Sequence, residues 1–397
     1  MLVSSIIDFE ATTIFKDRTT YVALLILDKS APDNFYYKKF SDQVETLAAS
    51  VRNTEIPEIS DAPYLCIDSA AISENPWSFD DPDLLKIRTK LLDFGKFGDF
   101  VKVKVGVQVL WDKAYHIRPI SIKNGILTGS SHLEEKFKLE LDACRPLICN
   151  ENFYPYRPDK GDVYIIFPYD VEAGVVTEIE FSKFKERFPL AAEYLKRNKR
   201  KIKANVETFA SSERWHLFTR VQNHGATYPK VLTPMTALDT YATVISSKKI
   251  YCDNANVYFM EIESKSSKNL YALAAIINST LFSVLSRSIA NPQMNGYYKF
   301  NKQFLDPVPF PVENFNNDLN GTINDLALTA KAIKRTQGKY LAASPNQQRF
   351  FAVQLEKYWI RLDELVYDLY ELGETDKQFF RHRGRNINRV ETLGDWK

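Results

Sequence analysis

The sequence predicts an α+β fold in which a small mixed sheet is followed by an α/β domain and then by an antiparallel helical hairpin. Three observations lead to this prediction: β-branched and apolar runs near the amino terminus, alternating strand and helix patterns in the middle, and two long helical repeats near the carboxyl terminus. With 397 residues the chain can bury a large core. Domains of roughly 100 to 200 residues each then imply two or three of them.

The first 83 residues are predicted to hold three strands and a linker. Apolar and β-branched runs at residues 4–9, 21–27 and 34–40 are separated by polar residues, which is typical of strands. Residues 57–83 carry several prolines and acidic residues with little periodicity. We therefore expect them to connect the first sheet to the next domain.

Residues 84–315 are predicted to form the second domain. Residues 98–117 indicate a strand, a glycine-marked turn and a second strand, and Asn124-Gly125 between apolar residues predicts a further hairpin. Pro189 suits the first turn of a helix, because its missing N–H would have no partner there. The buried face of that helix is predicted to hold Ala191, Leu195, Ile202, Val206 and Phe209.

Residues 316–373 predict the helical hairpin. In both helices the apolar residues alternate spacings of four and three; Gly338 is expected to end the first helix, and Ser344-Pro345 to begin the second. Because a short loop joins them, the helices are expected to pack antiparallel. Their apolar positions are Leu319, Ile323, Leu326, Ala330 and Ile333, then Phe351, Leu355, Tyr358, Leu362, Leu365, Leu369 and Leu372.

Residues 270–311 combine a helix with an aromatic and basic loop. Apolar residues recur at helical spacing from Leu273 to Leu285, so this helix is expected to press one apolar face into a core. Polar residues at 278–280 interrupt it well before the roughly 20 apolar residues that a membrane span needs. The loop that follows presents Tyr297, Tyr298 and Lys299. Rings that stack on bases and ammonium groups that meet phosphates suit a nucleic acid.

Composition limits the partners and the compartment. With 52 basic and 50 acidic residues the formal net charge is +2, so binding to a nucleic acid would come from local patches. Four cysteines, at positions 66, 144, 149 and 252, form no Cys-x-x-Cys pair, and the five histidines share no metal-ligand spacing. We therefore expect reduced, buried thiols, no metal site and, since no signal-peptide pattern is present, a cytoplasmic protein.

Several short motifs occur in the order of one known family. The helix at 270–285, the loop Gly-Tyr-Tyr-Lys-Phe and the Pro-x-Pro ending resemble the TaqI-type C-terminal specificity domain of adenine-specific DNA methyltransferases and of the related fused type II restriction-modification enzymes. Segments within 105–113, 144–170, 215–234 and 362–370 resemble further family motifs in the same order. One departure is Trp111, which stands where relatives carry glycine, so the local backbone or the groove-facing surface is expected to differ.

The resemblance implies that the first strands are the last strands of a Rossmann-like methyltransferase domain, so the chain is expected to begin late in that domain. The family's Asn/Asp-Pro-Pro-Tyr/Phe motif, which holds the flipped adenine, is missing: the two Asn-Pro pairs continue as Asn75-Pro76-Trp77 and Asn291-Pro292-Gln293. Residues 94–98 look like a glycine-rich cofactor turn but follow a predicted helix instead of a strand. We expect no methylation by this chain alone. S-adenosylmethionine is expected only of the complete enzyme.

Double-stranded DNA is the partner that the resemblance implies, bound through phosphate contacts and read at a short site in the major groove. The catalytic half is expected either from a separate methyltransferase subunit that completes the unfinished sheet or from the missing part of a truncated gene product. The basic tail at 374–397, with Arg381, Arg383, Arg385 and Arg389, is expected to be loose or to contact the DNA backbone.

The residues expected to contact DNA are basic, aromatic or amide side chains on the family motifs, on the helix after Pro189 and on the loop. Arg220 matches the two acceptors of guanine and Gln222 matches adenine, although Arg220 can equally hold a core carboxylate. The basic helix also has an alternative as a solvated amphipathic helix. The candidates are Gln108, Trp111, Lys113, Lys196, Arg197, Lys199, Arg200, Lys203, Arg220, Gln222, Tyr297, Tyr298, Lys299, Asn301 and Lys302.

Two other functions fit parts of the sequence. Asp253, Glu263 and Lys265 have the residue types of a metal-dependent nuclease, although two strands with polar residues at exposed positions explain the same pattern. The second is an interaction or anti-restriction protein that keeps the fold without sequence-specific recognition. DNA binding without a preferred site would favour this second function.

Overall fold

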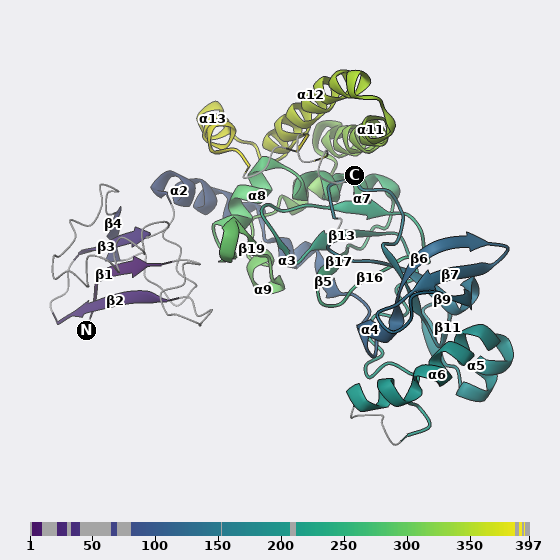
Figure 1. Cartoon of the computed structure of the whole chain (residues 1–397). Helices are drawn as coiled ribbons and strands as arrows, with labels where there is room; N and C mark the ends of the chain where they lie inside the picture. The colour runs from purple at the N-terminus through teal and green to yellow at the C-terminus, as the bar shows by residue number, and fades with distance from the viewer. Residues whose placement is uncertain are drawn as a thin grey trace.

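The computed structural model describes residues 2–9, 22–29, 33–39, 65–69, 81–151, 153–206, 212–385, 389–390 and 393. It is the mixed α+β fold that the sequence predicts, with several small sheets, a buried helical pair and a helical hairpin (Figure 1). Phe209, expected on the buried face of a helix, lies outside the described residues.

The amino-terminal sheet has four strands in the order β2-β1-β3-β4. They are β1 (Leu2–Asp8), β2 (Ala23–Asp28), β3 (Asn34–Lys39) and β4 (Leu65–Asp68). β1 runs parallel to β3 and antiparallel to β2. The three predicted strands are confirmed, but β4 lies in residues that we expected to be linker. A strand of four residues, in which Ile67 joins the core of Ile6, Phe35 and Tyr37 and Leu65 packs against it, is too short to show a periodicity.

A six-stranded sheet, in the order β16-β9-β10-β6-β7-β8, builds the middle of the chain. Asn124 and Gly125 both have positive φ, 49° and 75°, and they join β6 to β7 in the predicted hairpin. The strands are β6 (His116–Lys123), β7 (Ile126–Ser130), β8 (Phe137–Glu140), β9 (Cys144–Ile148), β10 (Val163–Ile166) and β16 (Tyr251–Cys252). A two-stranded ribbon of β11 (Tyr169–Glu172) and β12 (Val175–Glu178) follows β10.

Helices α5 (Phe181–Arg187) and α6 (Pro189–Asn205) pack beside this sheet. Pro189 occupies the first turn of α6, as predicted, and Ala191, Leu195, Ile202 and Val206 are buried. Tyr194 stacks on Phe137 of β8 with ring centroids 4.1 Å apart. This contact joins the helix to the edge of the sheet.

A second sheet, in the order β15-β13-β17-β5, contains β5 (Lys102–Val105), β13 (Lys230–Pro234), β15 (Thr243–Ile245) and β17 (Val257–Glu261). The second strand predicted within residues 98–117 was wrong. After β5 the chain crosses to the six-stranded sheet through the short helix α4 (Asp112–Tyr115). Gly106 lies at the crossing, where a Cβ atom would stand 1.9 Å from the carbonyl oxygen of Cys252. The glycine thus permits a close crossing and marks no hairpin turn.

Helix α7 (Ser267–Ile277) lies between the second sheet and the hairpin of α11 (Thr322–Ala342) and α12 (Pro345–Leu369) (Figure 1). All eight residues from Leu270 to Ile277 are buried, so the expectation of a single apolar face was wrong. A helix that packs on both sides needs apolar residues all round. Helix α8 (Thr280–Arg287) continues after a 57° bend. No single helix among the described residues is long and apolar enough to span a membrane. The bent pair of α7 and α8 has the length and apolar composition of a span only when the two helices are taken together.

The remaining helices are short or terminal. They are α2 (Pro82–Leu91), α3 (Phe97–Phe100), α9 (Lys302–Leu305), α10 (Val312–Asn316) and α13 (Glu374–Arg383). The predicted antiparallel packing of α11 on α12 is confirmed, and Ser344 caps α12 in a capping box with Gln347.

We expected Gly338 to end α11, but it lies inside this helix. A Cβ atom built on Gly338 meets nothing within 4 Å. Glycine in a helix costs about 1 kcal/mol relative to alanine. We therefore expect Gly338→Ala to raise the free energy of unfolding by about 1 kcal/mol, measured by urea denaturation. A loss of stability would contradict the continuous helix.

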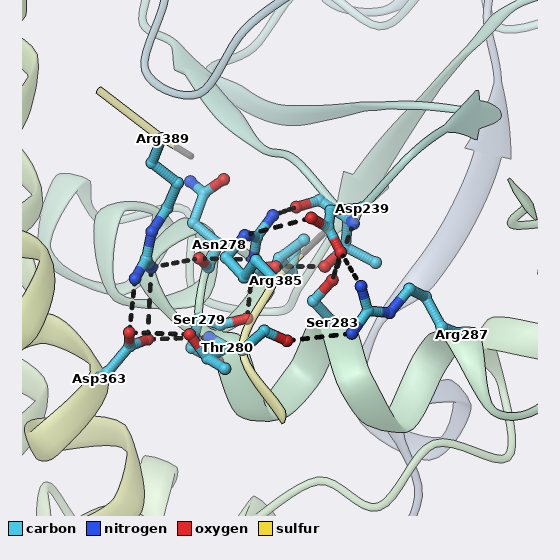
Figure 2. A network of polar contacts seen from close by, with 12 residues as sticks. Asp239, Asn278, Ser279, Thr280, Ser283, Arg287, Asp363, Arg385 and Arg389 are labelled. Carbon is cyan, nitrogen blue, oxygen red and sulfur yellow. Dashed lines mark hydrogen bonds and ion pairs between the residues drawn. The ribbon is translucent and has the colours of Figure 1, made fainter. Parts of the chain in front are cut away.

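The break between α7 and α8 is held by a buried polar network (Figure 2). The last carbonyl groups of α7 have no intrahelical donor. Arg385 donates to the carbonyl oxygens of Asn278 and Ser279 at 3.0 and 2.9 Å, and Arg389 donates to that of Asn278 at 3.1 Å. Cations are favourable at this end of a helix because its dipole is negative there.

Asp363 of α12 completes the network at the start of α8. Its carboxylate accepts from the backbone N–H and the hydroxyl of Thr280, both at 2.8 Å, and from Arg389 at 2.5 Å. Asp239, fully buried, accepts from Ser283 and Arg287 of α8 at 2.7 and 2.8 Å. The amino terminus of α8 thus faces a carboxylate, which its dipole favours.

The described part of the basic tail is neither loose nor unpaired. Arg381 pairs with Glu364 and Glu374, and Arg383 pairs with Asp81. Together with Arg385 and Arg389, all four arginines hold carboxylates or backbone carbonyls of the chain itself. Their charges are held within the fold, so the expectation that this tail is loose or contacts the DNA backbone was wrong for its described residues.

Candidate nucleic-acid interface

The loop after α8 is fixed by a small sheet in the order β14-β19-β18, formed by β14 (Thr236–Ala237), β18 (Asn291–Pro292) and β19 (Tyr298–Lys299). Asn295 and Gly296 take positive φ values of 60° and 74°, which turns the chain between β18 and β19. Tyr297, 43% exposed, stands at this turn. The loop therefore has a defined conformation and a defined outward face.

Side chains of the loop divide into outward and anchored groups. Lys299 is exposed, and Tyr298 is half-buried against Phe300 with ring centroids 6.2 Å apart. Asn301, half-buried, precedes the short helix α9. Lys302 is exposed but forms an ion pair with Asp306. Of the predicted contact residues on the loop, Tyr297 and Lys299 are thus the most open to a partner.

The glycine-containing turn at residues 94–98 packs against the chain after this loop. Phe97 and Gly98 donate backbone hydrogen bonds to the carbonyl oxygens of Val308 and Asp306, at 2.8 and 3.0 Å. A Cβ atom on Gly98 would come within 2.7 Å of the Asp306 side chain. Tight packing explains this glycine without a cofactor.

Helix α4 presents one exposed lysine. Lys113 lies at an open, polar cleft of about 1030 Å³ between α4 and the six-stranded sheet. Gln108 is half-buried, and Trp111 packs partly on the core of that sheet. Trp111 has an extended backbone, φ −157° and ψ 110°, which needs no glycine. The departure from the family pattern therefore leaves the backbone unstrained.

The same cleft contains residues that sequence reasoning did not single out. Arg118 and Lys160 line it with His116 and His132. A buried ion pair between Arg157 and Asp162, at 2.7 Å, forms part of the wall. Arg118 and Lys160 come from separate strands and turns, so no local motif joins them in the sequence.

The basic residues of α6 differ in their exposure and in their ion pairs. Lys196 and Arg200 are exposed, and neither forms an ion pair with a described residue. Arg197 pairs with Glu134 and Glu193 at 3.0 and 2.8 Å. The side-chain nitrogen of Lys199 lies 4.8 Å from the centre of the Trp215 ring. Lys199, Lys203 and Trp215 line a second cleft, of about 680 Å³. Among the predicted contact residues of α6, Lys196 and Arg200 therefore remain open for phosphates, and the neighbouring Lys201 is also exposed.

Arg220 and Gln222 follow the short segment after α6. Arg220 is exposed and pairs with no carboxylate among the described residues, so it does not hold a core carboxylate there. Gln222 is half-buried, and its amide donates to Asn254 at 3.2 Å. Arg220 is the freer of the two predicted base-reading side chains.

The nuclease constellation does not assemble. Asp253 is buried and accepts from Asn256 at 2.7 Å, ahead of β17, whereas Glu263 and Lys265 follow the strand at its other end. Lys265 pairs with Glu261 at 3.1 Å. Within the described ranges no three His, Cys, Asp or Glu residues gather as a metal site would need. The ends of two successive strands explain the pattern, and the described structure does not bring the three predicted nuclease residues together.

Buried histidines and cysteines serve packing. Burial lowers the pKa of His224 to about 4 and raises that of Cys252 to about 12, so both stay neutral near pH 7. His216 is buried and contacts the carbonyl oxygen of Ile179 at 2.8 Å. Cys66 is exposed, in contrast to the expectation that all four thiols are buried. All four cysteines are free.

The candidates therefore occupy three regions: the β18–β19 loop, the cleft at α4, and the outer face of α6. In the view of Figure 1 the labels α9, α4 and α6 lie toward the lower side of the molecule, and α11 and α12 lie at the top. The helical hairpin thus lies away from these three regions in this view.

The known proteins to which this chain is similar are restriction-modification enzymes. The sequence is similar to the Type II restriction enzyme and methyltransferase RM.Eco57I of Escherichia coli, with 20% identity over 399 residues, covering 94% of this chain and 38% of that protein. The chain thus spans well under half the length of this relative. No family model matches the sequence.

The fold is similar to that of the Type IIL restriction-modification enzyme MmeI, solved in complex with DNA. The TM-score is 0.51 at 11% identity, over 100% of this chain and 46% of MmeI. The type IIG restriction endonuclease BpuSI aligns over 93% of this chain and 44% of its own, with a TM-score of 0.37 at 11% identity. The chain is homologous to a type II restriction-modification enzyme and has the fold of part of one.

Proposed function

We propose that this chain is the DNA target-recognition part of an adenine-specific restriction-modification methyltransferase, with a recognition domain of the TaqI type. The observation that carries the proposal is the sequence similarity along 94% of the chain to a combined restriction enzyme and methyltransferase. Recognition of a short duplex site is the task that remains when the catalytic motifs are missing from the sequence.

The charges of the candidate regions support this proposal. Lys113, Lys196, Arg200, Arg220 and Lys299 are exposed, and none forms an ion pair with a described residue. Exposed cations gain by meeting phosphates, because each contact releases condensed counterions. Tyr297 adds an exposed ring beside Lys299. Phosphate contacts would position the duplex, and base contacts would supply the specificity.

Methyl transfer and S-adenosylmethionine binding are assigned to sequence outside these 397 residues, in one polypeptide or in a separate subunit. The edge strand β2 supports a neighbour there. Its Leu24, Leu25, Ile26 and Leu27 are 55%, 50%, 51% and 45% exposed. An edge strand with apolar side chains on both faces invites pairing and cover. We propose that the methyltransferase sheet continues beyond β2.

Binding of a labelled duplex, followed by fluorescence anisotropy over a range of salt, tests the contact regions. Replacing Lys299 and Lys302 with alanine is expected to weaken binding to all sequences alike. Removing one phosphate contact reduces the magnitude of the slope of log K against log salt by about 0.9. Because Lys302 already pairs with Asp306, Lys299→Ala is expected to account for most of the change.

Lys339→Ala is the matched control, since Lys339 is an exposed lysine on α11, away from the three candidate regions in Figure 1. It is expected to leave affinity and salt slope unchanged. If the loop variants behave like this control, the loop faces away from DNA. If the unaltered chain does not bind at low salt, the recognition proposal itself fails.

A further inference from the structure

The outer face of α12 carries apolar side chains in an exposed stripe. Phe350, Val353 and Ile360 are 62%, 52% and 62% exposed, whereas Leu355 and Leu362 of the same helix are fully buried in the core. Spacings of three and seven place the exposed three on one side of the helix. Leu328, on the neighbouring α11, is 56% exposed. A soluble surface rarely groups large apolar side chains in this way without a partner.

A row of charged residues on α12 flanks this stripe: Arg349, Glu356, Lys357 and Glu364. Arg349, Glu356 and Lys357 are exposed and form no ion pair with any described residue. Glu356 and Lys357 are consecutive, and consecutive residues on a helix do not face each other. Glu364, half-buried, completes the row and is bound by Arg381 at 2.9 Å. Arg349, Glu356 and Lys357 are thus the charges of this row that remain without an ion-pair partner among the described residues.

We propose that α12 pairs antiparallel with α12 of a second copy of this chain, about a two-fold axis that passes between Glu356 and Lys357. Positions equally far from the axis then face each other. Glu356 meets Lys357 of the second copy, and Val353 meets Ile360. Each contact occurs twice, because a two-fold interface uses the same surface on both copies.

The Glu356–Lys357 pair favours this register and a second copy of the chain as the partner. An axis on Glu356 or on Lys357 would set a charge against its own copy, whereas an axis between them sets each charge against the opposite charge. A helix that supplies the complement of its own exposed charges is suited to a copy of itself.

The interface is independent of the candidate DNA regions. In Figure 1 the α11–α12 hairpin lies at the top of the molecule, and α4, α6 and α9 lie toward the bottom. One helix per copy covers a small area, near the lower limit of roughly 1,200 Å² for stable interfaces. We therefore expect a weak dimer with a Kd on the order of 10 μM.

Sedimentation equilibrium of the 397-residue chain without DNA, from about 1 to about 100 μM, tests the proposal. A monomer–dimer equilibrium that weakens with salt is expected. Glu356→Lys and Lys357→Glu, each alone, place like charges opposite each other and are expected to raise Kd about tenfold or more. The double variant exchanges the two charges and is expected to restore Kd to within about threefold of the unaltered chain.

Two further variants separate the interface from general surface effects. Ile360→Asp removes an apolar contact at the stripe and is expected to abolish the dimer in this range. Glu186→Lys, a matched charge reversal at an exposed position of α5, is expected to change nothing. All these positions are exposed, and thermal unfolding of each variant checks that it folds. A monomer at every concentration overturns the proposal, and so does failure of the double variant to restore the dimer.

Discussion

Replacing Asp363 with alanine is expected to lower the free energy of unfolding by about 3 to 5 kcal/mol, the range for removing one partner of a buried ion pair. Asp363 and Arg389 expose only 12% of their side chains, and the carboxylate also accepts from the backbone and hydroxyl of Thr280. The substitution leaves the Arg389 charge without its carboxylate and the first N–H of α8 without an acceptor. Both effects act at the break between α7 and α8.

Asp325→Ala is the matched control, because Asp325 also pairs with an arginine, Arg361, but at 3.3 Å and with side chains 49% and 56% exposed. Exposed pairs contribute about 0 to 1 kcal/mol. Urea unfolding followed by circular dichroism measures both variants. Equal, small losses would mean that the network around Asp363 does not stabilise the helix break.

Replacing Lys230 with methionine is expected to change how stability depends on pH. Lys230 of β13 is 1% exposed, donates to the carbonyl oxygens of Ala226 and Ile250, and has no carboxylate partner among the described residues. The rings of Tyr251 and Phe259 lie 5.4 and 5.7 Å from its nitrogen. Burial lowers the pKa of Lys230 to about 8 from its ordinary 10.5.

The sign of the effect follows from proton binding. Below pH 8 the lysine is protonated in the folded and the unfolded chain, so its contribution is constant. Between pH 8 and 10.5 the unfolded chain still binds this proton and the folded chain does not, so stability rises with pH. Relative to Lys230→Met, the unaltered chain is expected to gain on the order of 2 to 3 kcal/mol between about pH 8 and about pH 10.

The comparison with the methionine variant is necessary because Cys252 opposes this trend. Burial raises its pKa to about 12, so the folded chain binds more protons than the unfolded chain above the ordinary thiol value of 9.0. The Lys230 cation lowers this pKa, so Lys230→Met raises it further. Up to about pH 10 the thiol stays protonated in both folded proteins, so its contribution cancels in their difference over this range. A difference in unfolding free energy that stays constant from about pH 7.5 to about pH 10 would show that Lys230 does not titrate in this window.

Much of the fold was predictable because its signals are local. The Asn124-Gly125 turn needs positive φ at both positions, and Pro189 suits only the first turn of a helix, so both elements follow from a few residues. Gly106 and Gly338 misled for the opposite reason. Gly106 is required by the approach of Cys252, which is distant in sequence, and Gly338 lies in a helix that the packing of α11 on α12 sustains.

The candidate site was less predictable. The aromatic and basic loop could be located, but the pairing of Lys302 with Asp306 and of Arg197 with Glu134 depends on tertiary structure. The arginines of the tail could not be assigned either, since their partners are carboxylates and carbonyl groups that are distant in sequence. The chain's own carboxylates compete with bases and phosphates for each lysine and arginine side chain. Only the folded structure shows which of these side chains remain available to DNA.

Selection from a pool of duplexes with a randomised central segment tests the recognition proposal most directly. The 397-residue chain is mixed with the pool at low salt, and bound duplexes are sequenced over several rounds. We expect enrichment of one short site, at which a single base change weakens binding about tenfold or more. Binding without enrichment of any site, or no binding at low salt, would contradict a role in target recognition.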